Sequence, residues 1–135
     1  MKIFIDSDAF IALLNKNDSL HQKAKQVLKN MEKIEVIELF SSWDVIDEVS
    51  TKISYFLGKE QARAFLEYVE ETKTNIVFPT PKLARTAKEN FIKLRSKRVS
   101  MTDCMNMAIV DQLDLDSIFS FDKVYEKQGV SLFSL

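Results

Sequence analysis

Four acidic residues stand out in this sequence by their position rather than by their number. Asp6 and Asp122 each follow directly on a short apolar stretch typical of a buried strand, and Asp103 opens an apolar helical pattern. Glu48 lies at the edge of the apolar stripe of another helical pattern. Because parallel strands end at one edge of a sheet, where ligands of such sheets gather, we expect these four carboxylates to converge on one crevice.

Carboxylates held this close need a cation to stay ionised, because like charges raise each other's pKa. Oxygen ligands without histidine or cysteine suit Mg²⁺ or Mn²⁺. The chain has one histidine, His21, and one cysteine, Cys104, which disfavours a His-based triad and excludes a multi-cysteine zinc site. A metal held by carboxylates can activate water and neutralise charge on a phosphodiester. These residues therefore favour metal-assisted hydrolysis of a phosphate ester.

Several of these acids have a structural alternative. Asp at a helix start accepts hydrogen bonds from free backbone N–H groups, so either Asp6 or Asp8 can cap the first helix. Since the strand-ending acid recurs at Asp122, we assign the metal role to Asp6 and the cap to Asp8. Asp103 completes a Ser-x-x-Asp spacing that resembles a capping box. Asp47 competes with its neighbour Glu48, because a helical register is easily shifted by one residue.

The elements that must position these acids alternate between strands and helices, which indicates an α/β fold with a mainly parallel sheet. The patterns predict strands at 2–5, 35–40, 75–78, 117–121 and 130–133. They predict helices at 9–14, 21–33, 43–57, 59–73, 82–96, 100–113 and 123–127. We expect the first strand to lie at the centre of the sheet.

Length and composition indicate an ordinary globular chain. Its 135 residues, 46% apolar and 29% charged, predict a single domain over residues 1–135. There is no signal-peptide pattern and no apolar run long enough for a membrane span, and a lone cysteine suits a reducing compartment, so we expect a cytoplasmic protein. The net charge of −1 does not by itself indicate nucleic-acid binding.

Four segments in order resemble the PIN domain family, especially the VapC-type toxin ribonucleases: IFIDSDAFIALL, WDVIDEVSTKI, SMTDCMNMAIV and SIFSFDKVYEKQGV. The resemblance covers essentially the whole chain and implies a three-layer α/β/α sandwich. It places the family's catalytic acids on Asp6, Glu48, Asp103 and Asp122. Of these, Asp6, Asp103 and Asp122 would bind the metal, and Glu48 would orient or deprotonate the attacking water.

The resemblance also covers residues around the acids. The family's small hydroxyl residue matches Ser120, two residues before the last acid, and Thr102 fits at the start of its helix. One position departs from the pattern. The residue two positions after the first acid is often Ser or Asn in the family, and here it is Asp8, which would either add a ligand or cap the helix.

By the same resemblance, the chain would be a Mg²⁺-dependent (or Mn²⁺-dependent) endoribonuclease that cuts single-stranded RNA. It would act as the toxin of a type II toxin–antitoxin pair, form a homodimer and bind a VapB-type antitoxin. A basic group would hold the RNA backbone: Arg85, Lys88, Lys93, Arg95, Lys97 and Arg98. The alternative for the run from Lys93 to Arg98 is a solvated helix end that complements the helix dipole.

Two other functions are compatible with part of the pattern. Asp6-Ser7-Asp8 matches the Asp-x-Asp nucleophile pair of haloacid-dehalogenase-like phosphatases, but the later paired acids of that family are reduced here to Asp122. A phosphatase would cleave a generic phosphomonoester and leave RNA intact. A catalytically inactive PIN-like binding module is the other alternative, although such a module would usually have lost one of the four acids.

Overall fold

The computed structural model describes residues 1–133. Its middle layer is a four-stranded sheet of β1 (Lys2–Ile5), β2 (Glu38–Ser42), β3 (Asn75–Val77) and β4 (Ser117–Phe119), in the order β3-β2-β1-β4. All three strand pairs are parallel. The α/β class and the inner position of β1 are therefore as predicted, and all four strands end at the same edge.

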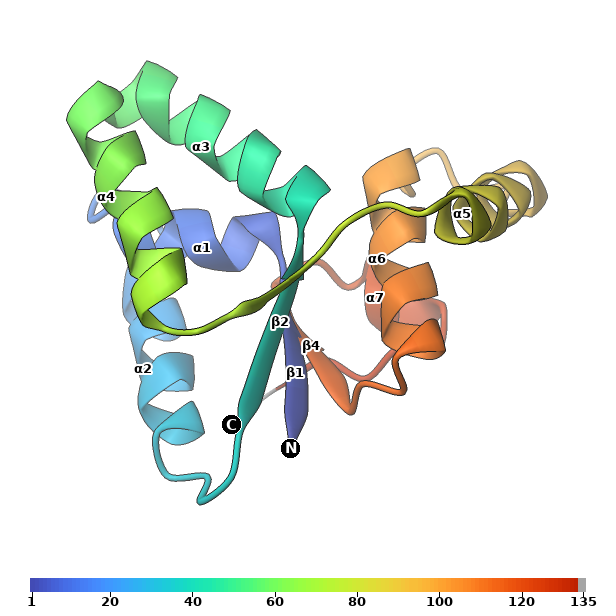
Figure 1. The fold of residues 1–135 in the computed structure, drawn as a ribbon, viewed down its shortest axis with the longest axis horizontal. Helices are drawn as coiled ribbons and strands as arrows, with labels where there is room; N and C mark the ends of the chain where they lie inside the picture. Colours follow the sequence, from blue (N-terminus) through green and yellow to red (C-terminus); the bar gives the residue numbers. More distant parts are fainter. Residues whose placement is uncertain (134–135) are drawn as a thin grey trace.

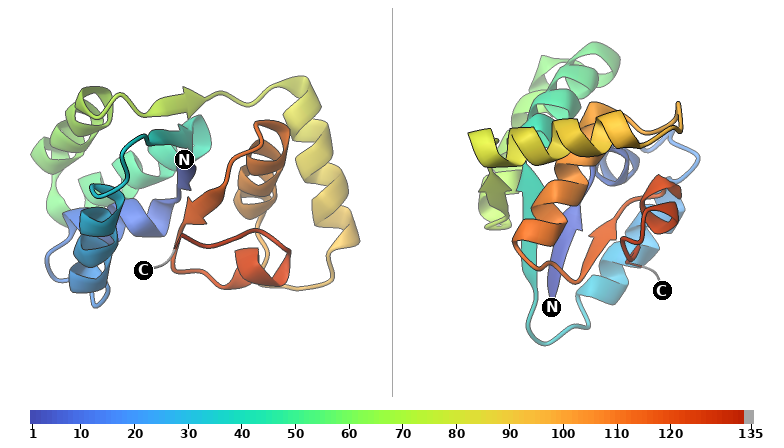
Figure 2. Two further views of the ribbon diagram at one scale, coloured as in Figure 1. Left: turned by 90° about the horizontal axis from the view of Figure 1, so that it is seen from below. Right: turned by 90° about the vertical axis from the view of Figure 1, so that its right-hand side faces the viewer.

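Helices cover both faces of this sheet (Figure 1). On one side lie α1 (Ser7–Leu14), α2 (His21–Met31), α3 (Trp43–Leu57) and α4 (Lys59–Glu71). On the other side lie α5 (Pro81–Lys93), α6 (Met101–Gln112) and α7 (Val124–Lys127). Figure 2 shows the same two groups of helices from two further directions, with the strands between them. The fold is the expected three-layer α/β/α sandwich.

Strands β3 and β4 end one and two residues earlier than predicted, and two other predicted strands differ more from the structure. The last, at 130–133, is reduced to one parallel bridge between Ile118 and Leu132, because β4 is only three residues long and offers little length for pairing. The second begins at Glu38 and continues through Ser41 and Ser42, which pair with β3. Both serines are buried, so residues expected to end the strand lie inside it.

The basic run also lies differently from the prediction. Helix α5 ends at Lys93, where the N–H of Leu94 closes the last turn by donating to the carbonyl of Asn90. Residues 95–98 therefore belong to the loop that leads into α6, and only Lys93 can complement the dipole of α5.

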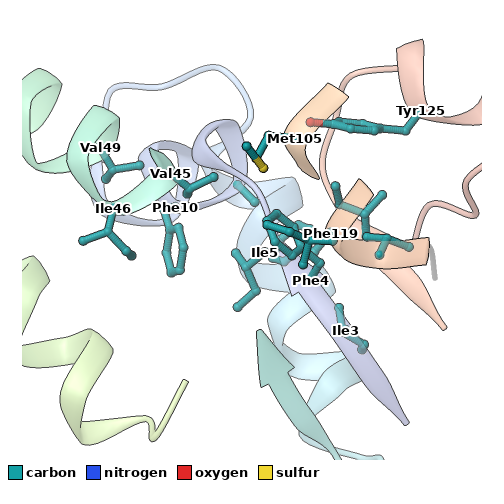
Figure 3. Packing of buried hydrophobic residues seen from close by; sticks show 14 of the residues in the cluster. Ile3, Phe4, Ile5, Phe10, Val45, Ile46, Val49, Met105, Phe119 and Tyr125 are labelled. Atoms are coloured by element: carbon teal, nitrogen blue, oxygen red, sulfur yellow. The ribbon is translucent and has the colours of Figure 1, made fainter. Parts of the chain in front are cut away.

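The core holds the site-bearing elements in place. Phe10 of α1 packs edge-on against Phe65 of α4, with ring centroids 5.2 Å apart, and Figure 3 shows side chains of α3 around Phe10. Helix α6 is buried on every side from Cys104 to Val110, as its apolar sequence predicts. No helix among residues 1–133 is long and apolar enough to cross a membrane.

Candidate active site

The four predicted acids line one pocket of about 340 Å³ at the carboxyl ends of the strands. Asp6 follows β1, Glu48 comes from α3, Asp103 from α6, and Asp122 from the loop after β4. The rest of the lining consists of Ser7, Asp8, Ser100 and Thr102. The parallel topology thus brings together acids that lie far apart in the sequence.

Helix α3 presents Glu48, not Asp47, to this pocket. Asp47 is exposed and is absent from the lining, whereas Glu48 is half-buried at the rim. Its Oε1 atom lies 2.8 Å from Nζ of Lys52, one turn further along the helix. Such a partly exposed i,i+4 pair contributes little to stability, so it leaves Glu48 available for other contacts.

Asp6 is the N-cap of α1, and the prediction that Asp8 caps this helix is wrong. Oδ1 of Asp6 accepts a hydrogen bond from the N–H of Ser7 at 2.8 Å. The helix begins at Ser7, which places Asp8 in its first turn, where its Oδ2 instead accepts from the N–H of Phe121 at 2.8 Å. Asp6 thus both caps α1 and lines the pocket. Asp8 binds the backbone of the loop that follows β4.

Three further donors surround the Asp6 carboxylate, which is buried. Nδ2 of Asn106 lies 3.1 Å from Oδ1, and Oγ of Ser120 and the hydroxyl of Tyr125 lie 3.1 and 2.9 Å from Oδ2. Ser120 also donates to Asp8 at 3.1 Å and accepts from the N–H of Asp122 at 3.1 Å. Ser120 therefore links Asp6 after β1, Asp8 in α1 and Asp122 after β4.

Asp103 has the structural role that its spacing allows and lies in the pocket as well. Its Oδ2 accepts from the N–H of Ser100 at 2.8 Å while its own N–H donates to Oγ of Ser100 at 3.0 Å, which completes the capping box. The other carboxylate oxygen, Oδ1, lies 3.2 Å from the hydroxyl of Tyr125. One oxygen is thus fixed by the helix start, and the other accepts from Tyr125.

The sequence did not identify Asn106 and Tyr125 as site residues, although both donate a hydrogen bond to Asp6. Asn106 is fully buried in the apolar stretch of α6, one turn after Asp103. A polar side chain inside an otherwise apolar buried helix is the signal that could have drawn attention to it, because buried amides need partners. Tyr125 resembles an ordinary core aromatic in the sequence and carries no such signal.

The basic residues proposed for RNA binding are all exposed, and none of the six lines the acidic pocket. Lys93 instead borders a second pocket of about 520 Å³, between α5, α6 and residues 128–131. Arg98 comes closest to the acids along the chain, because its loop leads to Ser100 at the pocket wall.

In a comparison with known protein families, the model of the PIN domain matches residues 3–130 of this chain. The chain belongs to the PIN domain family. This PIN domain superposes on the sarcin–ricin-loop-cleaving toxin VapC20 of Mycobacterium tuberculosis with a TM-score of 0.83, at 23% identity over 95% of each chain.

Two further solved structures resemble it. VapBC2 of Rickettsia felis, bound to a DNA fragment from its promoter, gives a TM-score of 0.68 at 15% identity over 98% of this chain and 97% of the other. FitAcB of Neisseria gonorrhoeae gives 0.69 at 15% identity over 98% and 96%. No curated protein matches the sequence. At these identities the likenesses establish the fold of the PIN domain.

Burial and mutual repulsion make the acids at the floor of the PIN domain's pocket hard to ionise. Burial, together with the charge of Asp8, raises the pKa of Asp6 from 3.8 to about 7, against the lowering effect of its hydrogen bonds. Burial likewise raises the pKa of Asp8, and the charge of Asp122 adds to the effect. Approaching neutral pH, the carboxyl group of Asp6 therefore still holds a proton that an isolated carboxylate would have lost.

The donor set suits a divalent cation. Oδ1 of Asp8 is buried and has no hydrogen-bond partner within residues 1–133. A cation in the pocket would give this oxygen a partner and relieve the repulsion on Asp6. Among residues 1–133, no three acidic, histidine or cysteine side chains lie close enough together to hold an ion in the observed arrangement. Protein donors also occupy most of the carboxylate oxygens of the pocket. A cation would therefore compete with internal hydrogen bonds for the same oxygens.

Proposed function

We propose that this PIN domain is a Mg²⁺- or Mn²⁺-dependent endoribonuclease that cuts single-stranded RNA, and that it is the toxin of a type II toxin–antitoxin pair. The pocket in which Asp6, Glu48, Asp103 and Asp122 meet is the observation that carries this proposal. The family match adds support, as does the likeness in fold to a toxin that cleaves the sarcin–ricin loop.

In this proposal Asp6, Asp103 and Asp122 hold the cation. When bound, Mg²⁺ or Mn²⁺ supplies activation of the attacking water and neutralisation of charge on the phosphodiester. Glu48, at the rim, orients that water and accepts its proton. Buried Asp6 stands at the floor and exposed Asp122 at the mouth, so the pocket has one closed and one open side.

Three more residues support these acids. Ser120 keeps Asp6, Asp8 and the backbone of Asp122 together through its hydroxyl. Asp8 adds negative charge to the pocket and offers its unpaired Oδ1 as a further ligand atom. Thr102 places a hydroxyl in the pocket wall, within reach of a water molecule or a phosphate oxygen.

RNA would approach from the side of α5. The exposed basic residues proposed to hold the RNA backbone lie on this helix and in the loop that ends at the pocket wall: Arg85, Lys88, Lys93, Arg95, Lys97 and Arg98. Phosphate contacts of this kind position a strand without reading its sequence. Separating the cation-binding acids from these basic residues explains why the net charge gives no sign of a nucleic-acid substrate.

Cleavage assays on the purified chain, freed of any inhibitor, test the proposal. We expect single-stranded RNA to be cut in Mg²⁺ or Mn²⁺ and to stay intact in EDTA, because the acids alone cannot neutralise the phosphodiester. A generic phosphomonoester such as p-nitrophenyl phosphate should remain uncleaved. Intact RNA with both metals would contradict the enzymatic proposal, and release of nitrophenol would favour the phosphatase alternative.

The proposed partners are a second copy of the chain, as a homodimer, and a VapB-type antitoxin. Two of the similar structures, VapBC2 and VapBC-1 of Haemophilus influenzae, carry this toxin–antitoxin name, which supports the second partner. Because the pocket is acidic, the antitoxin segment that fills it should present a basic side chain. We expect Mg²⁺ to weaken antitoxin binding in a titration, whereas binding that ignores Mg²⁺ would contradict a segment seated on the acids.

A further inference from the structure

Tyr125 lies directly behind the pocket wall and belongs to no part of its lining. It is fully buried on α7, and Figure 3 shows its hydroxyl oxygen directed away from α7 toward α6. There the oxygen lies 2.9 Å from Oδ2 of Asp6 and 3.2 Å from Oδ1 of Asp103. One hydroxyl thus joins an acid at the end of β1 to an acid on α6.

Asn106 determines which way this hydroxyl can donate. Its Nδ2 group donates to the Tyr125 oxygen at 3.0 Å and to Asp6 at 3.1 Å, and its Oδ1 faces Oγ of Ser42 at 3.4 Å. The amide is thereby held as a donor toward the tyrosine oxygen, so the single hydroxyl proton is left for a carboxylate. Asp6 and Asp103 share that proton.

Packing alone does not account for the hydroxyl. A phenylalanine ring would fill the same space, and a buried hydroxyl costs free energy unless it is hydrogen-bonded. In the part of the chain that the structure describes, this oxygen forms hydrogen bonds with Asp6, Asp103 and Asn106, and none with the backbone of α7. The Tyr125 hydroxyl therefore uses its hydrogen-bonding capacity on residues in and next to the site.

We propose that Tyr125 is a positioning residue of the cation site, whose hydroxyl holds the carboxylates of Asp6 and Asp103 at the spacing and orientation in which they take up a divalent cation. The proposal rests on the proposed function, since it concerns the same acids. Asp103 is held at Oδ2 by the start of α6, so the contact at Oδ1 fixes the remaining rotation of its carboxylate. Asp6 is held in the same way by Ser7 at one oxygen and Tyr125 at the other.

Tyr125→Phe tests this role with the ring and its packing retained. Outer residues that orient metal ligands typically change metal affinity by about 10–100-fold. We therefore expect the variant to bind Mn²⁺ at least about tenfold more weakly than wild type, measured by calorimetry and by electron paramagnetic resonance of the free ion. Cleavage should need correspondingly more Mg²⁺ and should recover at saturating Mg²⁺. Tyr55→Phe is the matched control, because Tyr55 is 82% exposed and absent from the pocket.

The outcomes separate this inference from the proposed function. Wild type that binds Mn²⁺, with Tyr125→Phe binding it equally well, overturns the positioning role and leaves the proposed function intact. Wild type that binds neither Mn²⁺ nor Mg²⁺ overturns the cation site itself, and the role of Tyr125 with it. A variant that melts at a lower temperature but retains wild-type Mn²⁺ affinity shows a purely structural hydroxyl and also counts against the proposal.

Discussion

Asp6→Asn is expected to abolish metal-dependent RNA cleavage without unfolding the protein. The substitution removes the most buried charge of the proposed cation site. Metal assistance is worth several kcal/mol of transition-state stabilisation, so we expect the cleavage rate to fall by about a thousandfold or more. Initial rates at saturating Mg²⁺, with wild type and variant compared at several RNA concentrations, measure this loss.

The fold should tolerate this change because the surroundings of Asp6 can accept an amide. Oδ1 would keep its bonds from Ser7 and Asn106, and an amide nitrogen in place of Oδ2 can donate to the hydroxyls of Ser120 and Tyr125. Removal of a buried charge next to Asp8 also relieves repulsion. We expect the variant's melting temperature in EDTA at pH 8 to equal or exceed that of wild type.

The comparison between Asp6→Asn and wild type should depend on pH. The pKa of Asp6 is about 7 in the folded chain against 3.8 as its ordinary value, so between these values the folded state binds a proton that the unfolded chain has lost. Wild type therefore loses stability as pH rises through this range, by at most about 1.4 kcal/mol per pH unit. Urea titrations in EDTA should show that the free energy of unfolding of the variant, relative to that of wild type, increases toward pH 8.

Asp47→Asn is the matched control for this experiment. Asp47 carries the same charge, lies beside Glu48 and is exposed outside the pocket. It should retain wild-type cleavage and the wild-type dependence of stability on pH. Retention of cleavage by Asp6→Asn, or parallel stability curves for that variant and wild type, would refute the assignment of Asp6.

Asn106→Asp is expected to destabilise the metal-free protein strongly at pH 8 and much less at pH 5. The new carboxylate would lie where Nδ2 now donates to Asp6 at 3.1 Å, in a fully buried position. It would replace a donor by a second negative charge, and an uncompensated buried charge costs about 3–5 kcal/mol. At pH 5 protonation of these carboxyls removes the repulsion, so most of that loss should disappear.

Urea titrations in EDTA at both pH values measure this effect, with Asn106→Ala as the control. The alanine variant loses the same hydrogen bonds but adds no charge, so its loss of stability should be similar at pH 5 and pH 8. Equal losses for Asn106→Asp at the two pH values would mean that charge repulsion at Asp6 is not the cause. Asn106 would then act through packing and hydrogen bonding alone.

Much of the fold and of the site follows from local patterns in the sequence. Strand β1 and helix α3 have the bounds that their apolar periodicity predicts, and the alternation of strands and helices implies the parallel sheet. Because parallel strands end at one edge, the meeting of Asp6, Glu48, Asp103 and Asp122 also follows. The capping box of α6 is equally local, since it spans four residues.

The tertiary structure decided the points at which local rules leave two choices open. Capping preference cannot distinguish Asp6 from Asp8, because both stand at the helix start; the observed choice depends on where the loop after β4 offers its N–H to Asp8. Periodicity likewise does not decide which of the neighbours Asp47 and Glu48 faces the site, and the packing of α3 turns Glu48 to the pocket.

Sequence patterns could not predict which residues are partners in the polar network behind the acids, even though Asn106 stands out as a polar residue in an apolar helix. Asn106 and Asp6 are 100 residues apart, and Tyr125 and Asp6 are 119 apart. Hydrophobic periodicity and capping rules act over a few residues. These contacts arise only when the sheet places β1 beside β4, the strand that α6 precedes and α7 follows. The sequence by itself determined that acids meet at the carboxyl ends of the strands. The tertiary structure decided that Glu48 rather than Asp47 is one of them, and which side chains hold them.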